Sequence, residues 1–306
     1  MDEFQFRPSY IQLPAFSTFS GEVRLPGSKS ITNRAFLIAA LARGTTRLHN
    51  LLKSDDTRYM GEALQKLGVK IDFSDDYSEA VVTGNAGPIS VEGVVDLYLG
   101  NAGTAMRSLT AALTLGRGEF SLGGEERMSE RPIRDLVDAL RSLGASIEYR
   151  ETEGYPPVHI KASGLAGGYV EVNGNISSQY LTALLICAPY CKAPLHIHVK
   201  GELISAPYIE LTMDVMRSFG IEVRHENLRD FYVPQGVYTL LPITTWRATR
   251  VRQATRWQLL PLLAARCACS VWARTASRAM SRLWMSSARW GQGWKLVRIG
   301  SSAVVA

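Results

Sequence analysis

Hydrophobic residues recur at spacings of three and four in three similar stretches of the chain, residues 57–71, 133–147 and 208–223. This spacing gathers the hydrophobic side chains on one face and predicts three amphipathic helices. Each stretch ends with a glycine between two hydrophobic residues, and the glycines are 76 residues apart each time: Gly68, Gly144 and Gly220. Glycine tolerates the left-handed conformation that commonly ends a helix, so we expect a helix cap at each position.

Three loops of small polar residues precede a second set of hydrophobic, helix-like stretches. The loops read PGSKSITNR at residues 26–34, GNAGTAMRS at residues 100–108 and GNISSQY at residues 174–180. Ser30, Thr104 and Ser178 within them are 74 residues apart each time. A fixed period in both kinds of helix indicates structural repetition. The pattern predicts an α/β fold in which three βαβ-containing units pack as one domain.

These loops contain more polar groups than helix capping requires, since one Ser, Thr or Asn is enough for a cap. The additional groups are Lys29 and Arg34 in the first loop, Arg107 in the second, and Ser177, Ser178 and Gln179 in the third. Helix-start N–H groups beside hydroxyls and a cation form an anion site. We therefore expect the loops to converge on one polyanionic ligand, with simple capping as the alternative.

Arg131 is the strongest candidate in the charged run EERMSERPIRDL, which otherwise resembles a solvated face. Pro132 follows it at a predicted helix start, where proline is favoured. A guanidinium fixed there can bind a carboxylate or a phosphate through two parallel hydrogen bonds.

Charge is distributed unevenly along the 306 residues. Residues 1–230 hold all 28 acids and 23 of the basic residues, whereas residues 231–306 hold no acid, ten Arg, one Lys and all six Trp. The formal net charge of +6 therefore reflects the carboxy-terminal part of the chain. The composition, 46% hydrophobic and 20% charged, allows two domains with buried cores.

The chain shows no targeting, membrane or metal-binding pattern. Its first residues lack a basic region followed by an apolar run, and no stretch approaches the ~18 apolar residues of a membrane span. The cysteines lack zinc-site spacing. Cys187 and Cys191 lie in an apolar run, where we expect buried free thiols. We expect a cytoplasmic protein without a metal.

The motifs LPGSKSITNRAFLIAALARG, LGNAGTAMRS, ERPI, SSQYLTALL and SAPYIE occur in this order and resemble the 5-enolpyruvylshikimate-3-phosphate synthases, also called 3-phosphoshikimate 1-carboxyvinyltransferases. The resemblance covers about residue 20 to Tyr238. It implies an α/β fold of two globes, each with three repeated βαβαββ-type units. Residues 23–238 form one globe, while residues 1–22 belong to the other, incomplete globe.

The activity implied by this resemblance is transfer of the enolpyruvyl group from phosphoenolpyruvate to shikimate 3-phosphate in aromatic amino-acid biosynthesis. It implies a monomer without cofactors, and glyphosate as an inhibitor. Implied phosphoenolpyruvate-binding residues are Lys29, Asn101, Gly103, Thr104, Arg131 and Gln179. Implied shikimate 3-phosphate-binding residues are Lys29, Ser30, Arg34, Ser177, Ser178, Gln179, Ser205 and Tyr208. Ser108 departs from the family, which usually has proline there.

The nearest alternative enzyme is the UDP-N-acetylglucosamine enolpyruvyl transferase, which shares the fold and the donor. That family uses a cysteine-bearing loop, whereas no cysteine precedes Cys187 here. The motifs PGSKS and SSQ also suit a phosphorylated acceptor.

Residues 239–306 do not resemble the family, whose sequence continues with a stretch like VEGDASSASY. If the codons of residues 245–254 are read in a shifted frame, from the third base of each codon to the second base of the next, they can encode that stretch. Later parts of the tail can encode further family-like sequence in the same way. We interpret residues 239–306 as a frameshift product, poorly ordered, and expect a chain without turnover. The alternatives are that this basic, Trp-bearing part of the chain binds nucleic acid or a membrane surface. Pro242 and Pro261 argue against both alternatives, because they interrupt any long helix.

Overall fold

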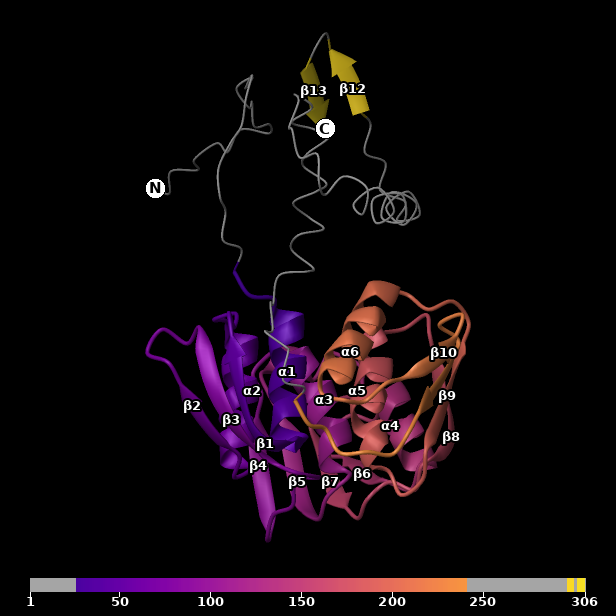
Figure 1. Cartoon of the computed structure of the whole chain (residues 1–306). Coiled ribbons are helices and arrows are strands. Elements are labelled where there is room, and N and C mark those ends of the chain that lie inside the picture. Colours follow the sequence, from indigo (N-terminus) through magenta and orange to yellow (C-terminus); the bar gives the residue numbers. More distant parts are fainter. Residues whose placement is uncertain (1–25, 241–295, 300–301, 306) are drawn as a thin grey trace, which may run out of the picture. The chain divides into compact units, whose positions relative to one another are not determined.

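The computed structural model describes residues 26–240, 296–299 and 302–305 (Figure 1). The chain divides into two compact units, one of Pro26–Ala248 and one of Met1–Leu25 with Thr249–Ala306. In the latter, the described residues form an antiparallel pair of strands, β12 (Leu296–Ile299) and β13 (Ser302–Val305). The interpretation of the tail as a frameshift product falls mainly on residues 241–295, which lie outside the described residues, as do residues 1–22.

Within Pro26–Ala248 the elements follow one another in three similar groups. The first group is α1 (Lys29–Leu41), β1 (Arg43–His49), α2 (Asp55–Lys66), β2 (Lys70–Phe73) and β3 (Glu79–Asn85). The second is β4 (Val94–Tyr98), α3 (Gly103–Leu113), β5 (Gly118–Gly123), a 3-10 turn (Glu126–Met128), α4 (Arg134–Ser142), β6 (Ser146–Tyr149) and β7 (Val158–Ala162). The third is β8 (Gly168–Asn173), α5 (Ser178–Cys187), a 3-10 turn (Ala188–Tyr190), β9 (Leu195–Lys200), α6 (Ala206–Ser218), β10 (Arg224–Glu226) and β11 (Asp230–Val233).

Each group forms its own sheet, and the second and third sheets have the same topology. The second sheet has the order β4-β5-β7-β6 and the third the order β8-β9-β11-β10. In both, the first two strands are parallel and the other pairings are antiparallel. The first sheet, β1-β3-β2, matches the last three positions of this order. The predicted α/β fold of βαβαββ-type units is therefore confirmed.

The first helix of each group lies in the interior of the globe. Helices α1, α3 and α5 run between the sheets (Figure 1), and nearly all of their residues are buried. This explains why hydrophobic residues occur on every side of these helices, whereas α2 and α4 have an exposed polar face. Among the described residues no helix has the length and hydrophobicity needed to cross a bilayer.

The predicted glycine caps are confirmed. Gly68, Gly144 and Gly220 have φ angles of 89°, 95° and 82°. Each N–H group donates to a carbonyl in the last turn of the preceding helix, with N–O distances of 2.9–3.0 Å. A side chain at such a φ angle costs free energy, so the fixed period of glycine reflects a fixed helix end.

The predicted start of one helix differs from the structure. Helix α4 begins at Arg134, so Pro132 lies in the preceding loop and not in the first helical turn. The reason is that Ile133 is held outside the helix by its N–H bond to the Gly154 carbonyl, at 2.9 Å. One residue beyond Tyr238, Thr239 still forms a β-bridge with Arg43, and its N–H group donates to the Phe219 carbonyl.

Candidate functional site

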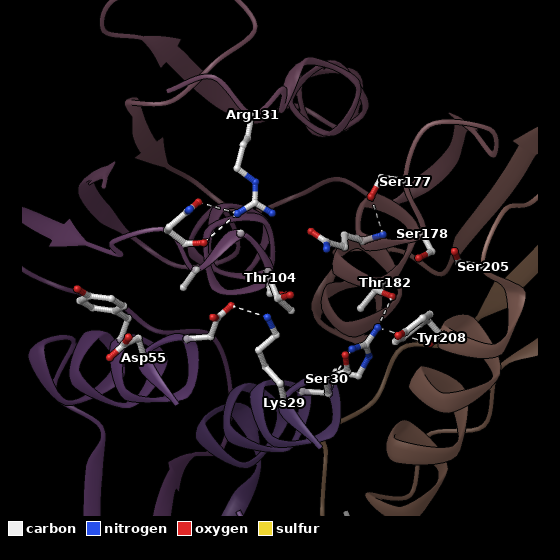
Figure 2. A pocket seen from close by; sticks show the side chains of 18 of the residues that line it. Lys29, Ser30, Asp55, Thr104, Arg131, Ser177, Ser178, Thr182, Ser205 and Tyr208 are labelled. Carbon is white, nitrogen blue, oxygen red and sulfur yellow. Dashed lines mark hydrogen bonds and ion pairs between the residues drawn. The ribbon is translucent and has the colours of Figure 1, made fainter. Parts of the chain in front are cut away.

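The starts of five helices meet at one pocket of about 750 Å³ (Figure 2). Residues near the starts of α1, α2, α3, α5 and α6 line it, together with residues of the loop before α4. Every residue to which a substrate was assigned lies on its wall: Lys29, Ser30, Arg34, Asn101, Gly103, Thr104, Arg131, Ser177, Ser178, Gln179, Ser205 and Tyr208. The loops thus converge in space, while the role of each residue stays a prediction.

Arg34 is a buried cation at the floor of this pocket, only 3% exposed. Its Nε donates to Thr212 Oγ1 at 2.8 Å, and its terminal nitrogens donate to Thr182 Oγ1 and to the Ser30 carbonyl at 3.0 and 2.8 Å. Burial lowers the pKa of Arg34 to about 10. Within the described residues no carboxylate pairs with this guanidinium, so an anionic ligand would relieve its isolation.

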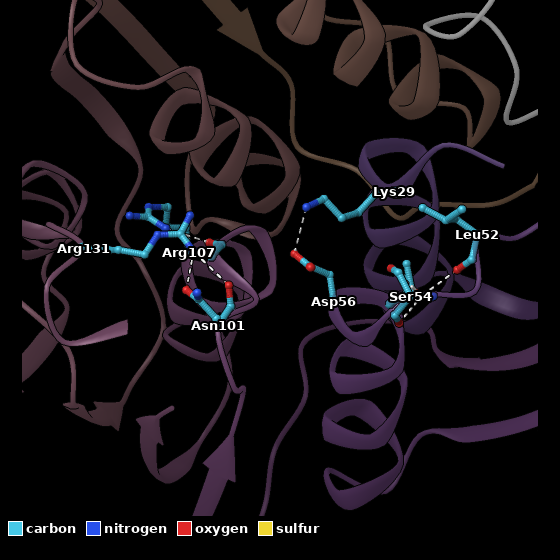
Figure 3. A network of polar contacts seen from close by, with 9 residues as sticks. Lys29, Leu52, Ser54, Asp56, Asn101, Arg107 and Arg131 are labelled. Atoms are coloured by element: carbon cyan, nitrogen blue, oxygen red, sulfur yellow. Dashed lines mark hydrogen bonds and ion pairs between the residues drawn. The ribbon is translucent and has the colours of Figure 1, made fainter. Parts of the chain in front are cut away.

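Arg131 reaches the start of α3 from the loop before α4. Its Nη1 donates to the carbonyl and to the side-chain Oδ1 of Asn101, at 2.8 and 2.9 Å (Figure 3). A Cβ atom on Gly103 would collide with the Arg131 guanidinium, so only glycine allows this approach. Arg131 also lacks a carboxylate partner among the described residues, which leaves its charge available to a ligand.

Arg107 does not line the pocket, although the sequence placed it beside the second loop as a candidate cation. Its two terminal nitrogens donate to the Gly103 and Pro132 carbonyls, at 3.0 and 2.9 Å. These bonds draw the guanidinium behind the pocket wall, where it is 6% exposed. Arg107 therefore stabilises the backbone behind the pocket and does not face a ligand.

The start of α5 brings three polar side chains to the pocket. Ser177 is the N-cap residue, and its Oγ accepts a hydrogen bond from the Gln179 N–H at 3.2 Å. Ser178, at the first helical position, is 9% exposed. The Oε1 atom of Gln179 is buried without a hydrogen-bond partner. An unpaired buried acceptor is costly, so this oxygen favours a ligand that donates a hydrogen bond.

Ser205 is the N-cap residue of α6, and it adopts a left-handed conformation with φ 57° and ψ 38°. Its side chain makes no cap hydrogen bond. Such a conformation is unfavourable for a non-glycine residue, and strain of this kind clusters at functional sites. One turn later, Tyr208 accepts bonds from Arg34 and Thr212 through its carbonyl, while its side chain is 37% exposed at the pocket.

Acidic residues also line the pocket, and the sequence analysis did not identify them. They are Asp55 and Asp56 at the start of α2 and Glu125 after β5, accompanied by Tyr59. Asp56 forms an ion pair with Lys29 (Figure 3). The repeat could have indicated two of them, because they occupy positions equivalent to predicted site residues. Asp55 lies 76 positions before Arg131, and Asp56 lies twice that distance before Tyr208. The second helices, and not only the first, present pocket residues.

The pocket combines unpaired guanidinium groups, serine hydroxyls and helix starts, which together favour small ligands with several negative charges. Figure 2 shows Arg131 apart from Ser177, Ser178 and Ser205, so the lining residues form two regions. Arg131 bonds Asn101 in one region. Arg34 bonds Thr182 of α5 and Thr212 of α6 in the other. Lys29 lies at the start of α1, next to Ser30. Two anionic groups can therefore be held near each other.

Comparison with known proteins identifies the relatives of this chain. Residues 14–247 match the family model described as EPSP synthase (3-phosphoshikimate 1-carboxyvinyltransferase). The chain is 56% identical, over 226 residues, to the 3-phosphoshikimate 1-carboxyvinyltransferases of Sulfurovum sp. and Photobacterium damsela subsp. piscicida. In each case the match covers 74% of this chain and 53% of the relative, so the chain spans about half the length of the curated relatives it matches.

Solved structures agree with this grouping. The EPSP synthase from Acinetobacter baumannii superposes with a TM-score of 0.62 and 26% identity, covering 72% of this chain and 48% of that one. The enolpyruvyl transferase NikO from Streptomyces tendae has a TM-score of 0.57 at 16% identity, covering 94% and 65%, which is a likeness of fold. With the repeated fold, the shared pocket motifs and the match over residues 14–247, the chain belongs to the EPSP synthase family.

Proposed function

We propose that the pocket binds shikimate 3-phosphate and phosphoenolpyruvate, as one half of the site for enolpyruvyl transfer between them. The observation that carries this proposal is the convergence of all the predicted substrate-binding residues on one pocket, where Arg34 and Arg131 lack carboxylate partners among the described residues. Each proposed substrate carries a phosphate and a carboxylate, so the ligands supply the negative charge that these guanidinium groups lack.

Shikimate 3-phosphate fits the region lined by α1, α5 and α6. Its phosphate would accept hydrogen bonds from Ser177, Ser178 and Ser205, and its carboxylate would lie near Ser30 and Arg34. The buried, unpaired Oε1 of Gln179 supports a ligand with hydroxyl groups, because a ring hydroxyl can donate to it. Tyr208 would cover the ligand from α6.

Phosphoenolpyruvate fits the region between Arg131 and Lys29, beside Asn101, Gly103 and Thr104. In the proposed reaction the acceptor hydroxyl loses its proton as its oxygen adds to C2 of the donor, and C3 gains a proton. Departure of phosphate and loss of one C3 proton then restore the carbon–carbon double bond. Arg131 and Lys29 would stabilise the charge that develops on the departing phosphate.

For the 306-residue chain by itself, we propose binding of shikimate 3-phosphate without turnover. Asp55, Asp56 and Glu125 are carboxylates within the pocket, but the resemblance implies a site built from two globes, of which residues 23–238 supply one. Closing a site around both substrates excludes water and completes the set of catalytic groups.

Calorimetric titration of the purified chain with shikimate 3-phosphate tests the binding proposal. Arg34→Met should abolish the binding heat, and Arg47→Met, which removes an exposed arginine of β1 outside the pocket, should leave it unchanged. A phosphate-release assay with both substrates tests the second part. Phosphate release above the level without protein would contradict the proposed lack of turnover.

The same proposal includes a monomeric protein without nucleic-acid or membrane partners, and glyphosate as a ligand of the donor region. Ser108 is buried and lines the pocket one turn after Thr104. Proline at this position would stiffen α3 beneath Gly103 and Thr104. In a full-length relative carrying residues 100–108 of this chain, glyphosate should inhibit less with Ser108 than after Ser108→Pro. Equal inhibition of both versions would refute this part.

A further inference from the structure

The carbonyl oxygen of Pro132 accepts hydrogen bonds from two buried side chains. Arg107 donates to it through Nη2 at 2.9 Å, and the Tyr180 hydroxyl donates to it at 2.7 Å. A carbonyl oxygen has two lone pairs, so the two donors saturate it. Arg107 comes from α3 and Tyr180 from α5, so this single oxygen joins two interior helices to the loop before α4.

The peptide that carries this oxygen is held from both sides. The N–H group of the same peptide, on Ile133, donates to the Gly154 carbonyl at 2.9 Å. Arg131 immediately precedes it, and its guanidinium is fixed to Asn101 at the other end of the side chain (Figure 3). The direction in which Arg131 leaves its loop therefore depends on where the Pro132 carbonyl lies.

Arg107 extends the connection to the start of α3. Its Nη1 donates to the Gly103 carbonyl at 3.0 Å, and its guanidinium lies 5.8 Å from the centre of the Tyr180 ring. Its Nε is buried without a hydrogen-bond partner. Burial, and to a smaller extent the nearby charge of Arg131, lower the pKa of Arg107. A cation kept in such an unfavourable place indicates that its two carbonyl contacts matter to the site.

Tyr180 connects this support to the opposite region of the pocket. It follows Ser177, Ser178 and Gln179 directly, in the first turn of α5. Its side chain is 2% exposed, so the ring cannot move without displacing its neighbours. Any shift of the α5 start on ligand binding is therefore transmitted to the Pro132 carbonyl.

We infer that Arg107 and Tyr180 are positioning residues that couple occupation of the α5 start by a phosphorylated ligand to the placement of Arg131. The inference rests on the proposed function, since it takes shikimate 3-phosphate as that ligand. Neither residue lines the pocket. Both act through the Pro132–Ile133 peptide, and the coupling prepares the second anion region once the first is filled.

Side-chain NMR of the full chain with isotope-labelled arginine tests the coupling. The Nε–H resonances of Arg34 and Arg131 are assigned by Arg34→Lys and Arg131→Lys, and both are followed during titration with shikimate 3-phosphate. In the unaltered chain both resonances should shift. In Tyr180→Phe the Arg34 shift should persist, while the Arg131 shift should fall at least about threefold because the contact that links them is removed.

Two further variants make the result specific. Arg107→Lys keeps the charge, but one nitrogen cannot serve two carbonyls in the same way, so it should also reduce the Arg131 shift. Tyr238→Phe is the matched control, because Tyr238 is equally buried and its hydroxyl donates to the Ile186 carbonyl at the far end of α5. It should leave the Arg131 shift intact.

An undiminished Arg131 shift in both Tyr180→Phe and Arg107→Lys would overturn the inference, as would an equal loss in Tyr238→Phe. A response of Arg34 without any response of Arg131 in the unaltered chain would overturn the coupling alone. If neither arginine responds in the unaltered chain, the proposed function fails and the inference fails with it.

Discussion

The ammonium nitrogen of Lys29 lies 3.2 Å from the Oδ1 atom of Asp56, which joins the first turns of α1 and α2 beside the pocket. Lys29 is one of the two residues, with Gln179, that are assigned to both proposed substrates. Its side chain is 46% exposed, and that of Asp56 is 24% exposed. An incoming phosphate must therefore compete with the Asp56 carboxylate for this lysine, or bind beside the pair.

Asp56→Asn should strengthen binding of phosphorylated ligands if the two anions compete. Ion pairs of this exposure contribute about 0.2–1 kcal/mol, so we expect the Kd of shikimate 3-phosphate to fall by roughly 1.4-fold to fivefold. Asp72→Asn is the control, because it removes a carboxylate paired with Lys70 on β2, outside the pocket. Weaker binding after Asp56→Asn would show instead that Asp56 holds Lys29 in the position that the ligand needs.

Arg34→Met should abolish binding of shikimate 3-phosphate without lowering the unfolding free energy of the chain. The groups that Arg34 contacts retain other partners after the change, because Thr182 and Thr212 bond each other at 3.1 Å and Thr212 also donates to the Tyr208 carbonyl. Replacing a buried charge that lacks an acidic partner by an apolar side chain often stabilises a protein, by about 1–4 kcal/mol for buried ion pairs. We expect an unfolding free energy in urea equal to or above that of the unaltered chain, with shikimate 3-phosphate binding lost.

A lower unfolding free energy for Arg34→Met would contradict this expectation. It would mean that the bonds from Arg34 to α5 and α6 hold the three helices together, and that the charge is retained for the fold as well as for the ligand. Arg34→Lys distinguishes the two explanations, because it preserves the charge but not the fork of donors.

The repeat and the pocket loops could be predicted because they depend on local patterns. The 76-residue spacing of Gly68, Gly144 and Gly220 reflects backbone conformation, and the small residues of loops such as GNAGTAMRS reflect close approach at a helix start. Both are properties of short segments, which hydrophobic period and turn chemistry determine.

The support of the site could not be predicted in the same way. The contact of Tyr180 with Pro132 joins residues 48 positions apart, and that of Arg34 with Thr212 joins residues 178 positions apart. Such contacts depend on how whole helices pack, and no local pattern distinguishes Tyr180 from an ordinary core tyrosine. Asp55 and Asp56 were missed for another reason, because acids in a first turn are common as partners of the helix dipole.

Ser205→Gly should stabilise the globe and weaken phosphate binding. Relief of the left-handed conformation contributes roughly 1 kcal/mol, reduced by the greater freedom of glycine in the unfolded chain. Loss of the hydroxyl removes one proposed phosphate contact. Ala86→Gly is the matched control, since Ala86 has a similar φ of 55° and lies on the surface outside the pocket. Urea unfolding and calorimetry should show higher stability in both variants and weaker binding only in Ser205→Gly.

The buried thiols provide a test of the globe that needs no substrate. Burial raises the pKa of Cys191 to about 11 and that of Cys187 well above its ordinary value. Only the thiolate reacts readily with iodoacetamide. At pH 8–9 we therefore expect peptide mass spectrometry to find both residues unlabelled in the native chain and rapidly labelled in urea, where their pKa values return to about 8.5.

The same shifts predict how stability changes with pH. A thiol whose pKa is higher in the folded state keeps its proton there while the unfolded chain loses it, so the folded state is favoured fully below about pH 8.5 and progressively less as pH rises toward the folded pKa. The urea midpoint should therefore fall between pH 8 and pH 10, and fall less in Cys191→Ala. Rapid native labelling at Cys187 would mean that the end of α5 is not packed as the structure describes. An unchanged pH dependence in Cys191→Ala would mean the same of the segment after the turn Ala188–Tyr190.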